Sequence, residues 1–140
     1  MPGFDEIVEA MKKGEWIPPI AKLIGMELLK AEGGEAEFTM IASDKHHNPM
    51  GTLHGGVMVD IMDAAMGMAF ASSLNKGELF TTINLQINYM KQVIEGRLTA
   101  TASIIKRGRS VGFLESELRD EQGDLVATAQ STCKVLKEKS

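Results

Sequence analysis

The sequence contains little cysteine, no long uninterrupted apolar run and no excess of basic residues, and each shortage excludes a class of protein. The single cysteine, Cys133, leaves no disulfide framework within one chain, as is typical of proteins in a reducing cytoplasm. Cys133 lies in an alternating run, whereas reactive thiols need nearby cations or a helix start. We therefore predict a small buried core residue there rather than a catalytic thiol.

Neither targeting nor membrane insertion is indicated. The first residues lack a basic region followed by an apolar stretch, so they do not resemble a secretory signal. Asp60 and Asp63 interrupt the longest apolar segment, residues 57–70, which is too short and too charged to span a bilayer. These features predict a soluble, cytoplasmic protein with no membrane partner.

Nucleic acids and metal ions are not expected partners either. The chain has 15 Lys and Arg against 19 Asp and Glu, a formal net charge of -4, whereas nucleic-acid-binding domains normally display a clustered basic face. The one basic cluster, residues 106–109, is too small to change this interpretation. His46 and His47 are adjacent, and adjacent side chains rarely bind the same metal ion. No acidic or cysteine partner follows them at the spacing of metal ligands, so no metal site is predicted.

The length of 140 residues fits a single domain, which at this size buries roughly 68–70% of the surface of its unfolded chain. No internal repeat or low-complexity tract divides it. We therefore expect one domain over residues 1–140, with a leading helix and linker in residues 1–19 and the core in residues 20–137.

One short helix and two strands are predicted before the middle of the chain. Residues 5–13 carry apolar side chains at helical spacing, and Gly14 ends that pattern. Residues 26–31 and 35–42 read as strands, and the pair Gly33-Gly34 between them tolerates the positive φ angles of a tight turn. An antiparallel pair is expected there.

A long helix and four more strands follow the loop at residues 43–53. Residues 55–74 are rich in Ala and Met, contain no proline and are apolar around nearly the whole circumference, which predicts a buried helix. The strands are predicted at residues 79–90, 97–105, 110–119 and 125–136, with short hairpin-like connections at Glu95-Gly96, Arg107-Gly108 and Gln122-Gly123.

This order predicts an α+β fold in which an antiparallel sheet curls around one long central helix. In the third strand, Ile83, Leu85, Ile87 and Tyr89 alternate with polar residues, which predicts one apolar face. An open curled sheet also leaves edges that a second chain can pair or cover, so dimerisation is expected.

Residues 48–56 predict a site for an anion or a developing oxyanion. Gly55 and Gly56 leave backbone N–H groups uncovered at a helix start, where the first turn has no internal acceptors. Asp63 lies eight residues after Gly55, so their backbones are about 12 Å apart along the helix. Because one carbonyl cannot contact both, the carboxylate must come from a second subunit, and a two-fold axis then creates two shared sites per dimer.

The spacing of Asn48, the His54-Gly55-Gly56 run, Asp63 and the strand end at residues 87–90 resembles the hotdog-fold acyl-CoA thioesterases, in particular the PaaI-like branch of the phenylacetate pathway. The likeness extends over residues 20–137. It implies a hotdog fold and the hydrolysis of acyl-CoA to a carboxylic acid and free CoA. No cofactor is implied, because CoA is part of the substrate. Self-association as a homodimer, paired into a homotetramer, is also expected.

The resemblance assigns roles to five residues. It implies that Gly55 offers its N–H to the thioester oxygen and that Asp63, from the neighbouring subunit, is the base or nucleophile. It implies that Asn48 positions the water or the carbonyl, that His54 supports the loop and orients the thioester, and that Thr82 holds the attacking water.

The same resemblance implies a CoA-binding region. Gly56 and the hairpin residues Arg107, Gly108, Arg109 and Ser110 match the region where relatives hold CoA, and cations with exposed N–H groups suit phosphates. An ordinary solvated basic turn is the alternative for this hairpin.

Several alternatives stay open at this stage. Asp60 adds a second carboxylate one turn before Asp63, and two close carboxylates raise each other's pKa, although the spacing match favours Asp63. A hydratase or dehydratase acting on enoyl-CoA would use His54 as an acid or base. A non-catalytic acyl-CoA-binding module is a third interpretation. Aryl, hydroxyaryl and medium-chain acyl groups are all compatible with the sequence.

Overall fold

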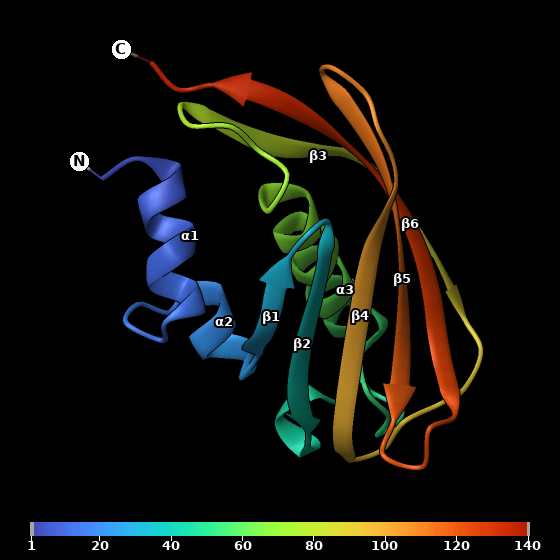
Figure 1. Ribbon diagram of the computed structural model, residues 1–140. Coiled ribbons are helices and arrows are strands. Elements are labelled where there is room, and N and C mark those ends of the chain that lie inside the picture. The colour runs from blue at the N-terminus through green and yellow to red at the C-terminus, as the bar shows by residue number, and fades with distance from the viewer. Residues whose placement is uncertain (1, 140) are drawn as a thin grey trace.

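One antiparallel sheet curls around a long helix (Figure 1). The computed structural model describes residues 2–139. In chain order the elements are α1 (Phe4–Lys12), α2 (Pro19–Ile24), β1 (Glu27–Glu32), β2 (Glu35–Ala42), a 3-10 turn η1 (Asp44–His46), α3 (Gly55–Ala71), β3 (Glu78–Tyr89), β4 (Gly96–Arg107), β5 (Val111–Asp120) and β6 (Leu125–Lys137). The predicted α+β class and the sheet around a central helix are confirmed.

The sheet has the strand order β1-β2-β4-β5-β6-β3, with antiparallel pairing throughout. The hairpin between β1 and β2 turns at Gly33 and Gly34, whose φ angles are +60° and +81°, as expected for a turn of this kind. The hairpins from β4 to β5 and from β5 to β6 are also confirmed. These three turns are local in sequence, and their glycines mark them.

The connection at Glu95-Gly96 is not a hairpin, and that prediction is wrong. β3 pairs only with β6, while β4 pairs with β2 and β5, so residues 90–95 cross from the edge of the sheet to its centre. Val93 is buried on this path, and its carbonyl accepts the N–H of Leu53. The crossing leaves β3 as an edge strand.

The helix α3 is the core of the fold because the sheet packs against it, although its first half keeps one partly exposed face. Ile61, Met62, Ala65, Met66 and Phe70 are among its fully buried side chains. The predicted helix ran to residue 74, but α3 ends at Ala71. The hydroxyls of the next two residues, both serines, donate to carbonyl oxygens of the last helical turn and so compete with its continuation.

The short helix α2 was not predicted. It lies within residues 18–26, with Pro19 at its first position and Gly25, at a φ of +89°, as its left-handed end. Both residues are helix-boundary signals, but six residues are too few for a helical period to be recognised. Figure 1 shows α1 and α2 side by side next to β1, where they cover one side of the curled sheet.

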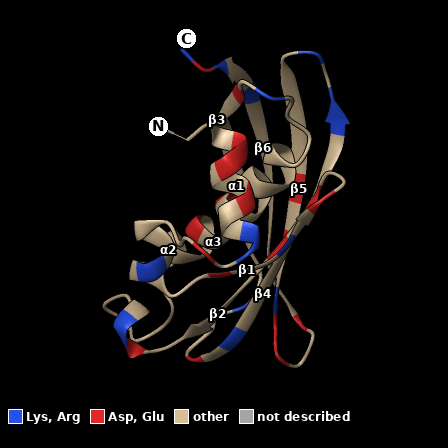
Figure 2. Ribbon diagram, turned by 60° about the vertical axis from the view of Figure 1, so that its left-hand side comes forward, with Lys and Arg blue, Asp and Glu red and all other residues tan. Residues whose placement is uncertain are grey.

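Charged residues of both signs are spread over the ribbon, and a basic segment marks the tip where β4 turns into β5 (Figure 2).

Cys133 is fully buried, which confirms its prediction as a core residue. Burial raises the pKa of its thiol, so the thiolate needed for reactivity is disfavoured. Within residues 2–139, no helix has the length and apolarity that crossing a membrane requires.

Candidate functional site

The start of α3 leaves one backbone donor free. Gly56 donates its N–H to His54 Nδ1 at 2.9 Å, and Val57 donates to the carbonyl of His54 at 3.0 Å. Gly55 is the first helical residue and has no acceptor one turn earlier, and no other hydrogen bond from its N–H is found among residues 2–139. Of the two glycines, only Gly55 therefore keeps an available donor for a ligand.

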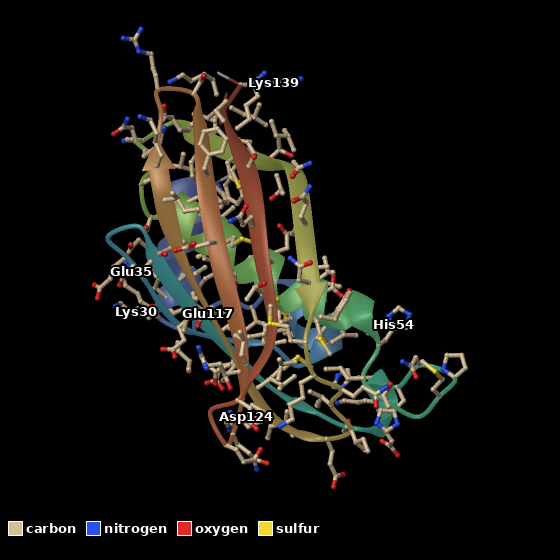
Figure 3. The ribbon with its side chains drawn as sticks, turned by 90° about the vertical axis from the view of Figure 1, so that its right-hand side faces the viewer. Lys30, Glu35, His54, Glu117, Asp124 and Lys139 are labelled. Carbon is tan, nitrogen blue, oxygen red and sulfur yellow. The ribbon has the colours of Figure 1, made fainter. Side chains whose placement is uncertain are left out.

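His54 is fixed in one tautomer by the same contact. Because Nδ1 accepts the hydrogen bond from Gly56, the proton of the neutral ring lies on Nε2. His54 is exposed and projects from the start of α3 beside the end of β3 (Figure 3). Its Nε2–H is therefore a second donor close to Gly55.

Tyr89 holds this helix start from β3. Its hydroxyl donates to the carbonyl oxygen of Gly55 at 2.9 Å. A Cβ atom on Gly55 would lie 2.8 Å from that hydroxyl oxygen, so only glycine fits beneath the ring. Sequence reasoning placed Tyr89 on a strand but missed this contact, because no short-range pattern links residues 34 positions apart.

Asn48 builds the loop that leads to the helix. Its side-chain oxygen accepts the N–H groups of Met50 and Thr52 at 2.9 and 3.2 Å, and its amide donates to the Thr52 hydroxyl at 2.9 Å. Most of the hydrogen bonds that this side chain can form are therefore made within the loop. In one chain, Asn48 acts as a support for the segment that carries His54 and Gly55.

Asp63 forms a second group with Thr82. The Thr82 hydroxyl donates to Asp63 Oδ1 at 3.0 Å. Burial raises the pKa of Asp63 above its ordinary value of 3.8, and the hydrogen bond from Thr82 opposes that rise. Among residues 2–139, Asp63 forms no ion pair, and a partly buried carboxylate of this kind is an effective base once it is ionised.

A β-bulge aims Thr82 at the helix. The register of β3 against β6 shifts between Thr82 and Asn84, so Ile83 is an extra residue and is 56% exposed. Its predicted place on the apolar face is therefore wrong, while Leu85 and Ile87 pack against the core as predicted. The bulge lets Thr82 and these later residues share the inner face.

Asp60 lies near this second group. Burial is the main cause of its raised pKa, Asp63 raises it further, and His54 opposes the rise. No hydrogen bond holds the Asp60 side chain among the bonds of the described residues, in contrast to Asp63 with its Thr82 partner. The geometry therefore favours Asp63 as the positioned carboxylate.

The two groups do not meet within one chain. Gly55 and Asp63 are on the same helix, eight residues and about 12 Å apart along its axis. A cavity of about 430 Å³ opens beside Gly55, Asn48 and Tyr89. A separate apolar cavity of about 400 Å³ opens beside Asp63 and Thr82. Within one chain, Gly55 and Asp63 therefore line two different cavities.

The basic hairpin lies at the other end of α3. The Arg107 guanidinium stacks 4.9 Å from the centre of the Phe70 ring, donates to Ser73 Oγ at 2.9 Å and also bonds the carbonyl of Gly108. Phe70 is about 22 Å along the helix from Gly55. Arg107 is therefore committed to internal contacts, whereas Arg109 and Ser110 are exposed.

Metal ligation finds no support in this region. In the part of the chain that the structure describes, no three His, Cys, Asp or Glu side chains are grouped so that they could hold an ion. His46 and His47 instead bond the backbone carbonyls of Ile24 and Ile94. The donor set around α3 is suited to an organic oxyanion.

Comparisons with known proteins find thioesterases and hydrolases of CoA thioesters. The family model described as the thioesterase superfamily matches residues 50–127. The 1,4-dihydroxy-2-naphthoyl-CoA hydrolase of Listeria monocytogenes is 30% identical over 120 residues, which are 86% of this chain and 98% of that protein. The medium/long-chain acyl-CoA thioesterase YigI of Escherichia coli is 30% identical over 132 residues, covering 81% of this chain and 83% of that protein.

Solved structures share the fold. A phenylacetic acid degradation-related protein from Ralstonia eutropha has 30% identity and a TM-score of 0.83, covering 91% of this chain and 98% of that one. The PaaI protein of Escherichia coli has 24% identity and a TM-score of 0.81, with 86% of each chain covered, a likeness of fold alone.

Proposed function

The chain belongs to the thioesterase superfamily, and from this premise we propose that it hydrolyses acyl-CoA thioesters to a carboxylic acid and free CoA. The observation that carries the proposal is the pairing, on one helix, of a free Gly55 N–H with a partly buried Asp63 held by Thr82. Thioester hydrolysis needs a donor for the oxyanion and a base for water, and these groups supply both.

The proposed site forms between two subunits. β3 ends the strand order and pairs only with β6, so its outer edge has backbone groups available for a second copy. Pairing of two such edges about a two-fold axis would run the two α3 helices antiparallel. Gly55 would then face the partner subunit's Asp63, and two equivalent sites would form per dimer. Further pairing into a dimer of dimers is part of the proposal.

The proposed mechanism uses each group once. Gly55 N–H donates to the thioester carbonyl oxygen, and Asp63 takes a proton from water as its oxygen attacks the carbonyl carbon. The tetrahedral oxyanion collapses, the C–S bond breaks, and the CoA thiolate takes the proton that Asp63 carries. Thr82 keeps Asp63 oriented through its donated hydrogen bond, and its oxygen can accept a hydrogen bond from the water.

Asp63 could alternatively attack the carbonyl carbon directly and form an anhydride, which water then hydrolyses. In a single turnover in ¹⁸O-labelled water, ¹⁸O found in Asp63 would identify the anhydride route. The base route puts ¹⁸O into the released acid, whereas water attack on the Asp63 carbon of the anhydride puts ¹⁸O into Asp63.

CoA itself is held outside these groups in the proposal. The His54 Nε2–H lies near the thioester, and the exposed Arg109 and Ser110 at the hairpin tip contact the phosphates. Gly108, whose N–H donates to the carbonyl of Val111 at 2.8 Å, shapes the turn that carries them. Arg107 shapes the hairpin by its internal contacts. The proposed enzyme needs no cofactor and works in the cytoplasm, where its buried single thiol, Cys133, stays reduced.

Mixing two inactive variants tests the shared site. Asp63→Asn removes the carboxylate. Gly55→Pro removes the N–H at the first helical position, where proline is compatible with helical backbone, although its added ring atoms also crowd the Tyr89 hydroxyl. In a mixed dimer one site receives both defects and the other receives none. Random reassociation of equal amounts should therefore restore roughly one quarter of the wild-type thiol release.

Size-exclusion chromatography with light scattering should show that both variants are dimers. Failure of the mixture to exceed the sum of its parts, despite subunit exchange, would contradict the shared site. Enoyl-CoA hydration without thiol release would instead favour the hydratase interpretation, and binding without turnover would favour a binding module.

A further inference from the structure

The apolar cavity beside Asp63 is walled by elements from distant parts of the chain. α3 supplies one side through Asp63, Ala64 and neighbouring residues, and β3 supplies another through Thr82 and Phe80. The two N-terminal helices, α1 and α2, supply further lining residues. Its volume is about 400 Å³, well above the roughly 150 Å³ of an apolar cavity that accepts benzene.

We propose that this cavity takes an unsubstituted medium-chain acyl group and that α1, through Phe4 and Met11, sets the longest chain that fits. The inference rests on the proposed thioester hydrolysis, because it names the substrate class of the same site. The reacting carbonyl would lie at Asp63, with the hydrocarbon extending along α3.

The polarity of the lining selects against hydroxylated acyl groups. Asp63 and Thr82 are the two polar side chains among the lining residues, and they are bonded to each other. A hydroxyl on an aryl ring would enter the cavity without a partner, which lowers binding about tenfold to a hundredfold. A saturated chain loses no hydrogen bonds on entry.

Small residues on α3 make room for the chain. Ala64 and Gly67 face the cavity, and a Cβ atom on Gly67 would lie 3.0 Å from the Phe80 ring. From Asp63 to Met68 the cavity follows the helix for five residues, about 7.5 Å. A saturated acyl chain can therefore lie along this apolar stretch of the helix.

The helix α1 forms one wall of the cavity. Phe4 and Met11 are seven residues apart, so they lie on one face of α1, and both line the cavity. The Phe4 ring lies 5.9 Å from the Phe80 ring, and the Phe4 N–H donates to the Glu138 carboxylate at 2.5 Å. These contacts hold Phe4 in place beside the cavity.

A chain-length series tests the inference. We expect kcat/KM for saturated acyl-CoA esters to rise about fourfold per methylene until the wall is reached and then to fall. Met11→Ala should move the preferred length to longer chains, and Met11→Trp should move it to shorter ones. Glu9→Ala, on an exposed part of the same helix, is the matched control and should leave the profile unchanged.

Two results would overturn the inference. One is a profile in Met11→Ala that matches the control, with circular dichroism showing both variants folded. The other is a higher kcat/KM for hydroxybenzoyl-CoA than for octanoyl-CoA. If Met11→Ala does not fold, the chain-length profile of kcat/KM is measured in Phe4→Ala instead, and it should likewise shift to longer chains.

Binding separates this inference from the proposed function. If no ester releases a thiol, the hydrolase proposal fails, and calorimetry with the same acyl-CoA series still tests the cavity. Affinity that increases with chain length up to a limit, and a limit that shifts in Met11→Ala, would support the cavity as an acyl site. Affinity independent of chain length would contradict it.

Discussion

The Tyr89 hydroxyl donates to the carbonyl oxygen of Gly55 at 2.9 Å, which joins the end of β3 to the start of α3. Gly55 also carries the backbone N–H that is the one donor in the first turn of α3 without a hydrogen-bond partner among residues 2–139. Tyr89 therefore sets the direction in which the proposed oxyanion donor points.

Gly55→Ala should lower kcat by about a hundredfold. The new Cβ would lie 2.8 Å from the Tyr89 hydroxyl oxygen, so the helix start or the ring must move, and a displacement of about 1 Å is costly to catalysis. Steady-state kinetics measure the effect. Adding Tyr89→Phe to Gly55→Ala should recover part of the loss, and a double variant slower than Gly55→Ala would contradict a steric cause.

Asp63→Asn should reduce kcat by about 10²- to 10⁴-fold, the usual contribution of a positioned acid or base. Asp60→Asn is the matched control one turn earlier and should stay within about threefold of wild type. A thiol-trapping assay, with circular dichroism for folding, compares the two. The reverse order of effects would assign the chemistry to Asp60.

In a pH–rate profile, kcat/KM should fall on the acid side, and the midpoint of this acid limb should lie above the ordinary Asp pKa of 3.8. Burial raises the pKa of Asp63, and the reaction needs its ionised form, so kcat/KM is present above the raised pKa and lost as the pH falls through it. Thr82→Val removes a hydrogen bond that favours the carboxylate. The limb should therefore move to higher pH, and the variant should lose more activity at pH 6 than at pH 8.

A pH limb in Thr82→Val at the wild-type position, or at lower pH, would show that another group controls the profile. The Thr82→Ser variant keeps the hydroxyl and is the control. It should retain the wild-type limb.

Arg107 and Arg109 should differ in effect although they share one hairpin. Arg107→Ala removes the contacts to Phe70 and Ser73, so it should lower the melting temperature by several degrees. Arg109→Ala should instead raise KM severalfold with little change in melting temperature, because its side chain is exposed and available to phosphates. Equal KM values for wild type and Arg109→Ala would remove the hairpin from CoA binding.

The sequence was sufficient for the parts of the fold that local signals determine. Gly33-Gly34 marked the first hairpin, and the apolar content of residues 55–74 predicted the buried helix that the structure has at residues 55–71. The place of β3 at the edge was not predictable in this way. Strand partners far apart in sequence are chosen by the whole sheet, and a short glycine-containing connection at residues 95–96 looked like a turn.

The site was predicted as a set of residues but not as a geometry. Asp63, Thr82 and Gly55 were recognised from spacing and resemblance, and the structure adds the contact between Thr82 and Asp63. The bulge at Ile83 was missed because one inserted residue reverses an alternation that otherwise continues. The internal contacts of Arg107 depend on where α3 ends, which the helical pattern overestimated.

The hydrogen bond from Phe4 to Glu138 joins two positions that are 134 residues apart. The residue that follows the last strand is therefore bonded to the first residue of α1, the helix that lines the apolar cavity. A substitution such as Glu138→Ala, far from the reacting carbonyl, loosens that boundary. If the cavity is the acyl site that we propose, changes near residue 138 would alter the preferred acyl group while leaving the chemistry at the carbonyl intact.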